Sequence, residues 1–305
     1  MNKFVLRQSL LLLLAATIWG VAFVAQSVGM EHVGPYTFLA SRSFLGAFVL
    51  LPVIYFREQS KKKAGPNDAS GNDSDKEGVK HLILAGICCG ICLFVASILQ
   101  QIGIMDTTVG KSGFITAMYI VVVPVLGIFL KKKAGLKIWC GVMLAVIGLY
   151  FLCMTPGNIA IQKGDLLIGL CAVVFSFHIL TVDYFAEKLD GVKISCLQFL
   201  VCGILASIGM FILEQPRVES ILAAGLPIAY AGVLSSGVGY TLQIVGQRGL
   251  NPTVASLLMS MESVISVIAG WAILGQSLSA REILGCVLMF CAIVLVQLPE
   301  KIKKW

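Results

Sequence analysis

The stretch "SLLMSMESVISVIAG", residues 256–270, is an apolar run that carries a single carboxylate, Glu262, near its middle. With its flanking residues the run covers about 252–274, the length of a helix that crosses a bilayer. Glu262 lies about ten residues into that helix and therefore ~15 Å deep. A charge at this depth costs at least ~2.5–3.5 kcal/mol, so Glu262 is a functional candidate. A hydrogen-bonded Glu that holds helices together is the structural alternative.

The composition of the whole chain agrees with a membrane setting. Hydrophobic residues make up 58% of the 305 residues and charged residues only 13%, whereas an average soluble domain has roughly 25% charged residues. A soluble protein with this balance could not cover its surface with polar groups. We therefore expect an all-α integral membrane protein, because lipid cannot satisfy an open backbone.

Ten apolar stretches have the length of a membrane-spanning helix. None alternates as a transmembrane strand would. The first follows Lys3 and Arg7 and continues too far for a cleaved signal peptide, so we interpret it as an uncleaved helix. The predicted spans lie near 9–28, 36–56, 82–104, 112–130, 138–154, 165–183, 194–213, 221–243, 252–274 and 282–298.

Basic residues predict the orientation of these spans. With the N-terminus inside, 18 of the 23 lysines and arginines fall in inside segments and four fall outside. This asymmetry predicts a multi-pass protein of the cell membrane with both termini in the cytoplasm. The net charge of +7 is then a topology signal and does not indicate nucleic acid. Residues 57–80, which are polar and charged, are predicted to form a flexible cytoplasmic loop.

The two halves of the chain repeat each other weakly. A shift of 156 residues aligns Trp19 with Phe175 and Arg42 with Gln198, and a shift of 144 aligns Ser112 with Ser256. We therefore predict two five-helix repeats, residues 1–154 and 155–305. Since five is odd, the repeats enter the membrane from opposite sides, which is the inverted-repeat architecture of many secondary transporters.

Several motifs at specific places in these repeats resemble a known family. Ile18-Trp19-Gly20-x-x-Phe23, Arg42, Pro124-Val125 and Glu262 are similar to the drug/metabolite transporter superfamily, specifically its EamA-type ten-helix members. The resemblance implies metabolite transport, frequently export of amino acids or related molecules. Ser263 follows Glu262 where family members usually have proline, and Gly275-Gln276 stands where they often have Gly-Glu. The ninth helix thus lacks the proline that would break it at its centre.

Polar and aromatic residues deep in the spans are the candidates for substrate binding. Arg42 could attract a carboxylate or phosphate, or it could extend to the interface or bond backbone carbonyls. His178 could relay protons or simply pack with a hydrogen-bond partner. Pro124, which removes a backbone hydrogen bond and predicts a kink in the fourth span, is a candidate gate. The predicted binding residues are Glu262, Trp19, Arg42, Tyr119, His178, Gln100 and Gln243.

Two classes of function remain open at this stage. The first is a secondary active transporter, an exporter of a small polar or amphipathic metabolite such as an amino acid. It works by alternating access, with Glu262 either lining the cavity or coupling transport to protons. The second is an integral membrane enzyme or lipid-handling protein that uses Glu262, Arg42 and His178. No nucleotide-binding or hydrolase motif is found, and Cys89-x-x-Cys92 lacks a second pair for metal. We expect no cofactor, a small-molecule substrate, the bilayer as partner, and a monomer or weak homodimer.

Overall fold

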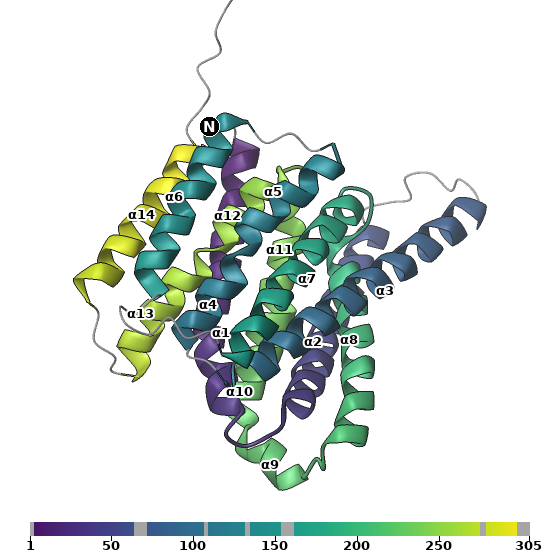
Figure 1. The fold of residues 1–305 in the computed structure, drawn as a ribbon. Helices are drawn as coiled ribbons and strands as arrows, with labels where there is room; N and C mark the ends of the chain where they lie inside the picture. Colours follow the sequence, from purple (N-terminus) through teal and green to yellow (C-terminus); the bar gives the residue numbers. More distant parts are fainter. Residues whose placement is uncertain are drawn as a thin grey trace, which may run out of the picture.

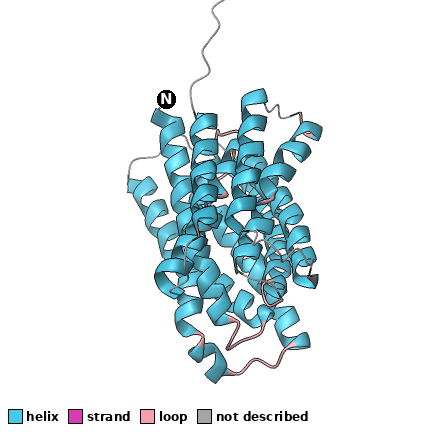
Figure 2. Cartoon of the chain, turned by 60° about the vertical axis from the view of Figure 1, so that its left-hand side comes forward, coloured by secondary structure: helices cyan, strands magenta, loops and turns pink. Residues whose placement is uncertain are grey.

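The computed structural model describes residues 3–63, 72–106, 109–131, 135–153, 162–274 and 279–297, and within these ranges helices are the only regular elements (Figures 1 and 2). The elements of the first half are α1 (Lys3–Gly29), α2 (Pro35–Lys63), α3 (Asn72–Gly103), α4 (Val109–Ala117), α5 (Tyr119–Phe129) and α6 (Leu136–Cys153). Those of the second half are α7 (Lys163–Ala186), α8 (Gly191–Leu213), α9 (Val218–Ala223), α10 (Gly225–Ala229), the π-helix η1 (Tyr230–Gly239), α11 (Tyr240–Gln247), α12 (Pro252–Met259), α13 (Glu262–Leu274) and α14 (Ala280–Gln297).

The helices confirm the predicted membrane fold. Eight helical stretches among the described residues are long and apolar enough to span a bilayer, and two shorter apolar helices, α6 and α14, complete the set. Two of the eight are built from shorter pieces, because α4 and α5 together form the fourth span and α12 and α13 the ninth. The eighth span is continuous from α10 through η1 to α11.

The two halves are arranged as inverted repeats. The first helices of the halves, α1 and α7, run in opposite directions (Figure 1). Contacts between the halves come in matched sets. The third span of the first half, α3, packs on α7 and α8. Its counterpart in the second half packs on the equivalent helices, since η1 and α11 contact α1 and η1 contacts α2. In the same way α13 packs on α1, and α4 and α5 pack on α7. The pairs α2–α8 and α6–α14 are each formed by equivalent helices, as a two-fold axis in the membrane plane requires.

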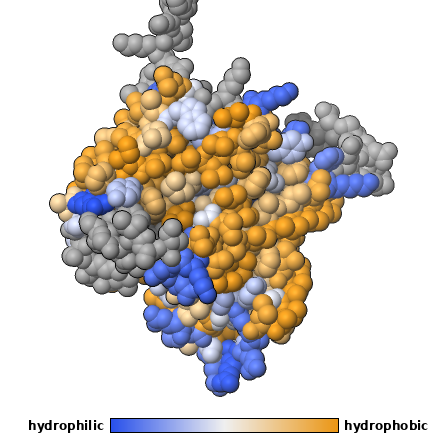
Figure 3. Space-filling view, in the orientation of Figure 1, coloured by the Kyte–Doolittle hydropathy of each residue, from blue (hydrophilic) through white to orange (hydrophobic). Residues whose placement is uncertain are grey.

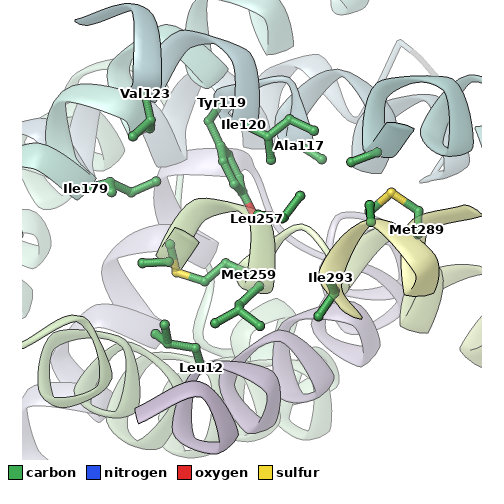
Figure 4. Packing of buried hydrophobic residues seen from close by; sticks show 14 of the residues in the cluster. Leu12, Ala117, Tyr119, Ile120, Val123, Ile179, Leu257, Met259, Met289 and Ile293 are labelled. Carbon is green, nitrogen blue, oxygen red and sulfur yellow. The ribbon is translucent and has the colours of Figure 1, made fainter. Parts of the chain in front are cut away.

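The packed interior lies where the broken spans meet α1 and α7. Leu12, Ile120 and Leu257 are fully buried there together with residues of α7 and α14 (Figure 4). Apolar side chains also cover the outer surface (Figure 3). Large apolar residues such as Phe129, Phe211 and Ile212 are more than two-thirds exposed, which is the pattern of a surface solvated by lipid.

Two predictions about segment boundaries were wrong. Residues 57–63 and 72–80, expected in a flexible loop, are helical extensions of α2 and α3, and residues 64–71 lie outside the described part. Lys, Glu, Gln and Arg are good helix formers, so a helix can continue past the membrane. The eighth span begins at Gly225 instead of 221. The preceding apolar residues form the short helix α9, where Leu222 is exposed.

Candidate functional site

Both broken spans are interrupted at equivalent positions. The fourth span breaks at Met118, between α4 and α5, and the ninth at Ser260 and Met261, just before Glu262. The 144-residue shift of the repeat superposes Met118 on Glu262. The break in the ninth span was not predicted, because no proline follows Glu262. The fourth span breaks six residues before Pro124, through which α5 runs as a helix.

Serine hydroxyls replace the proline as the local cause of the break in the ninth span. The Ser260 hydroxyl donates a hydrogen bond of 2.7 Å to the Leu257 carbonyl, and the Ser263 hydroxyl donates one of 3.0 Å to the Gly113 carbonyl on α4. Such side-chain bonds give the backbone an alternative to the helical ladder. The Ser260 bond therefore satisfies one carbonyl at the buried end of α12, and the Ser263 bond links α13 to α4.

The break explains how the fold accommodates Glu262 at mid-membrane depth. Glu262 lies in the first turn of α13, where the positive end of the helix dipole favours a carboxylate. The Tyr119 hydroxyl, at the first residue of α5, donates a hydrogen bond of 2.9 Å to Glu262 Oε1. Both side chains are buried. The two breaks of the inverted repeats are thus joined by the Tyr119–Glu262 hydrogen bond, beside the Ser263 bond to α4.

A cavity opens beside this hydrogen bond, between the two repeats. Its volume is about 40 Å³, and since one buried water needs ~10–15 Å³, it holds only a few waters. Of the predicted binding residues, six line it: Trp19, Arg42, Gln100, Tyr119, Gln243 and Glu262. Their role in binding stays a prediction. The other lining residues are Ala22, Phe23, Gln26, Thr116, Phe175, Ile179, Ser235, Tyr240 and Met259.

Arg42 is the most unusual member of this lining. Its side chain is 4% exposed, and its guanidinium carbon lies 6.0 Å from the centre of the Phe38 ring. Among the described residues no hydrogen-bond or ion-pair partner reaches the guanidinium, and Nε is buried without one. Gln26 Oε1 and Gln243 Oε1 are also buried without a partner. Because unpaired buried polar groups are costly, this lining is suited to a polar ligand.

The π-helix η1 supplies one cavity residue that the sequence did not reveal, Ser235. A π-helix adds a residue to each turn and is often found at functional sites. The Ser235 carbonyl in η1 accepts a hydrogen bond of 3.3 Å from Trp19 Nε1. The rings of Trp19 and Tyr240 lie 4.7 Å apart. Thr116 was also missed; its hydroxyl accepts a bond of 3.1 Å from Gln100 Nε2.

His178 does not line the cavity. Its ring is fully buried and its Nε2 lies 3.0 Å from Gln198 Oε1. The rings of Phe175 and Tyr240 lie against it, at 6.4 and 6.0 Å between centroids, and both residues line the cavity. His178 therefore stands behind the cavity wall. Pro124 is buried within α5 and is also absent from the lining.

Comparison with known proteins identifies the family. The EamA-like transporter family matches the chain twice, over residues 6–154 and 162–298. The chain belongs to this family. Among curated relatives, an uncharacterized transporter of Archaeoglobus fulgidus is 25% identical over 94% of this chain and 84% of its own length. The uncharacterized transporter YoaV of Bacillus subtilis is 22% identical, over 90% of this chain and 91% of its own.

The fold has also been observed in a solved structure. That crystal structure superposes with a TM-score of 0.76 at 16% identity, covering 95% of this chain and 96% of the other. At this identity the likeness concerns the fold alone. Together the fold and the family make this chain a multi-pass membrane transporter.

Proposed function

We propose that the protein is a secondary active exporter of a small metabolite that carries both a carboxylate and an ammonium group, such as an amino acid. The observation that carries this proposal is the lining of the central cavity. Arg42 on α2 and Glu262 on α13 face the same cavity, and no ion pair joins them in the described part of the chain. A zwitterion would place its carboxylate at Arg42 and its ammonium at Glu262 and the free amide oxygens.

The substrate is moved by alternating access between the inverted repeats. A cavity of about 40 Å³ is too small for an amino acid, so this conformation is closed and the repeats must separate to admit one. The near-symmetry of the repeats provides two similar packings, open to opposite sides. The distribution of basic residues favours a topology with both termini in the cytoplasm. The buried carboxylate of Glu262 couples transport to protons.

The alternative of a membrane enzyme requires Glu262, Arg42 and His178 to act together. His178 is separated from the cavity by Phe175 and Tyr240. This arrangement favours transport.

Transport in proteoliposomes tests the proposal directly. Vesicles are loaded with labelled amino acids, with their carboxamides, or with their N-acetyl derivatives, and efflux is measured. We expect efflux of the zwitterions and little of either derivative. Equal efflux of all three would contradict recognition of both charges.

Substitution of Arg42 makes the test specific to the site. Arg42→Gln removes charge-assisted hydrogen bonds of ~1.5–3 kcal/mol, which corresponds to a ~10- to 100-fold loss of transport efficiency for zwitterions. Arg7→Gln, a change at an exposed position of α1, is the matched control and should leave efflux unchanged. Undiminished zwitterion efflux by Arg42→Gln would remove Arg42 from the site.

A further inference from the structure

A second hollow lies on the outer surface, away from the central cavity. It is a groove of about 480 Å³ lined by Cys88 of α3, by Phe177, Leu180, Thr181, Tyr184 and Phe185 of α7, and by Leu126, Phe129 and Leu130 at the end of α5. Both α3 and α5 pack against α7, which therefore forms the floor of the groove. The face made by these helices is predominantly apolar (Figure 3).

The shape and chemistry of the groove suit a hydrocarbon chain. Its hydroxyl-bearing members are Thr181 and Tyr184. The Thr181 hydroxyl is already satisfied, because it donates to the Phe177 carbonyl at 2.8 Å. Tyr184 and Phe129 are 62% and 80% exposed. An acyl chain is apolar along its length and surrounds the protein in a bilayer, so it is the occupant that matches this lining.

Two lysines, Lys131 and Lys188, lie at one end of the groove. The helices α5 and α7 both end at the face of the molecule where α1 begins (Figure 1). Lys188 Nζ lies 5.1 Å from the centre of the Tyr184 ring, so this ammonium stands at the groove wall. Lys131, which follows the groove residue Leu130, is exposed and has a positive φ of 58°.

Nearby acids do not cancel this charge. Asp190 is engaged by Arg57 and by the first backbone N–H groups of α8, and Asp183 is buried. Glu187 is the exposed acid at the end of α7, and Arg248 Nη2 donates a bond of 3.3 Å to its carbonyl. Among the described residues at this end, Lys131, Lys188 and Arg248 thus outnumber the exposed acid Glu187.

We propose that the groove is a binding site for an anionic glycerophospholipid. One acyl chain lies along α7 between α3 and α5, and the headgroup phosphate binds the ammonium groups of Lys131 and Lys188. Basic side chains near a membrane surface are attracted to anionic lipid, and the apolar groove fixes where that lipid stays. Since α7 also carries Phe175 and Ile179 of the cavity wall, the bound lipid supports one wall of the transport site.

Lipid binding can be measured by native mass spectrometry of the detergent-purified protein. The probes are phosphatidylglycerol and phosphatidylcholine with identical acyl chains. We expect the wild-type protein to bind phosphatidylglycerol ~10- to 30-fold more tightly, because two cations attract its net negative headgroup, whereas the choline of phosphatidylcholine neutralises the phosphate. Equal affinity for the two lipids would overturn the proposal.

Two kinds of variant locate the site. The double variant Lys131→Gln/Lys188→Gln should lose the preference for phosphatidylglycerol and still bind phosphatidylcholine. The control Lys3→Gln/Arg7→Gln removes two exposed cations from α1 and should keep the preference. Cys88→Trp, which fills the groove, should weaken the binding of both lipids. A preference that survives in the lysine double variant, or a dimer that Cys88→Trp dissociates, would show that the groove does not serve a lipid.

Discussion

At the scale of single residues, the position of Glu262 is the feature that most needs a physical explanation. The side chain is 5% exposed, yet it has a hydrogen-bond donor in Tyr119 and lies at the start of a helix. Both arrangements favour a buried carboxylate. They also place the group beside the cavity, where an opening of the repeats would expose it to solvent.

Glu262→Gln separates coupling from binding. Glutamine keeps the size of the side chain and an oxygen that can accept from Tyr119, but it cannot exchange a proton. If Glu262 couples transport to protons, the variant loses accumulation driven by a pH gradient. It keeps exchange of substrate across a vesicle membrane, with weaker substrate binding, because the glutamine oxygen can still accept from the ammonium group. Both activities are measured in the same proteoliposome preparation.

Tyr119→Phe is the companion variant. The carboxyl of Glu262 stays in place, so accumulation driven by a pH gradient should persist. Because the carboxyl loses its hydrogen-bond donor, the free energy of unfolding should fall by about 1–3 kcal/mol. Normal pH-driven accumulation by Glu262→Gln would rule out the coupling role. Complete loss of exchange as well would leave Glu262 with a binding or structural role only.

At the scale of helices, the site depends on how closely α1 crosses α13. Gly20 faces the start of α13, and a Cβ built on it would lie 2.5 Å from Ile265 Cβ and 2.7 Å from the Glu262 carbonyl oxygen. The missing side chain therefore allows the two backbones to approach, as small residues do between membrane helices. This crossing fixes the position of the Glu262 turn relative to Trp19 on α1.

Gly20→Ala should separate α1 from α13 and disturb the cavity. We expect overpacking to lower the free energy of unfolding by about 1–3 kcal/mol and to lower transport activity. Gly78→Ala is the matched control, since a Cβ there would meet nothing within 4 Å, and alanine in a helix is favoured over glycine by roughly 0.5–1 kcal/mol. Thermal unfolding in detergent compares the two. Equal melting temperatures would mean that the crossing tolerates a methyl group.

At the scale of the whole molecule, the two repeats are fastened at both ends of the α2–α8 pair. At one end, the Glu214 carboxylate after α8 accepts hydrogen bonds from the backbone N–H groups of Tyr36 and Thr37 at 2.9 and 2.8 Å, and from the Thr37 hydroxyl at 2.6 Å. At the other end, Arg57 and Glu58 of α2 pair with Asp190 and Lys193 of α8. Since α2 and α8 belong to different repeats, these contacts hold the halves together.

Glu214→Ala should loosen one end of this pair. It leaves the first N–H groups of α2 without their acceptor, and charged hydrogen bonds of this kind contribute ~1.5–3 kcal/mol. The melting temperature should fall, and hydrogen exchange at Tyr36 and Thr37 should quicken. Glu219→Ala, at an exposed position in α9, is the control. Unchanged exchange at the start of α2 would show that Glu214 does not fasten it.

The sequence alone was sufficient for the class of protein, the approximate spans and the inverted repeat, because these follow from long-range averages of hydrophobicity and charge. It also pointed to Arg42, Glu262, Trp19, Gln100 and Gln243, since polar groups and a deep tryptophan stand out in apolar helices. Only the tertiary structure decided that the ninth span breaks before Glu262, that Tyr119 bonds it, and that His178 lies behind the wall. Those facts depend on serine hydroxyls, close helix crossings and a π-helix, which arise when distant segments pack and which no local pattern records.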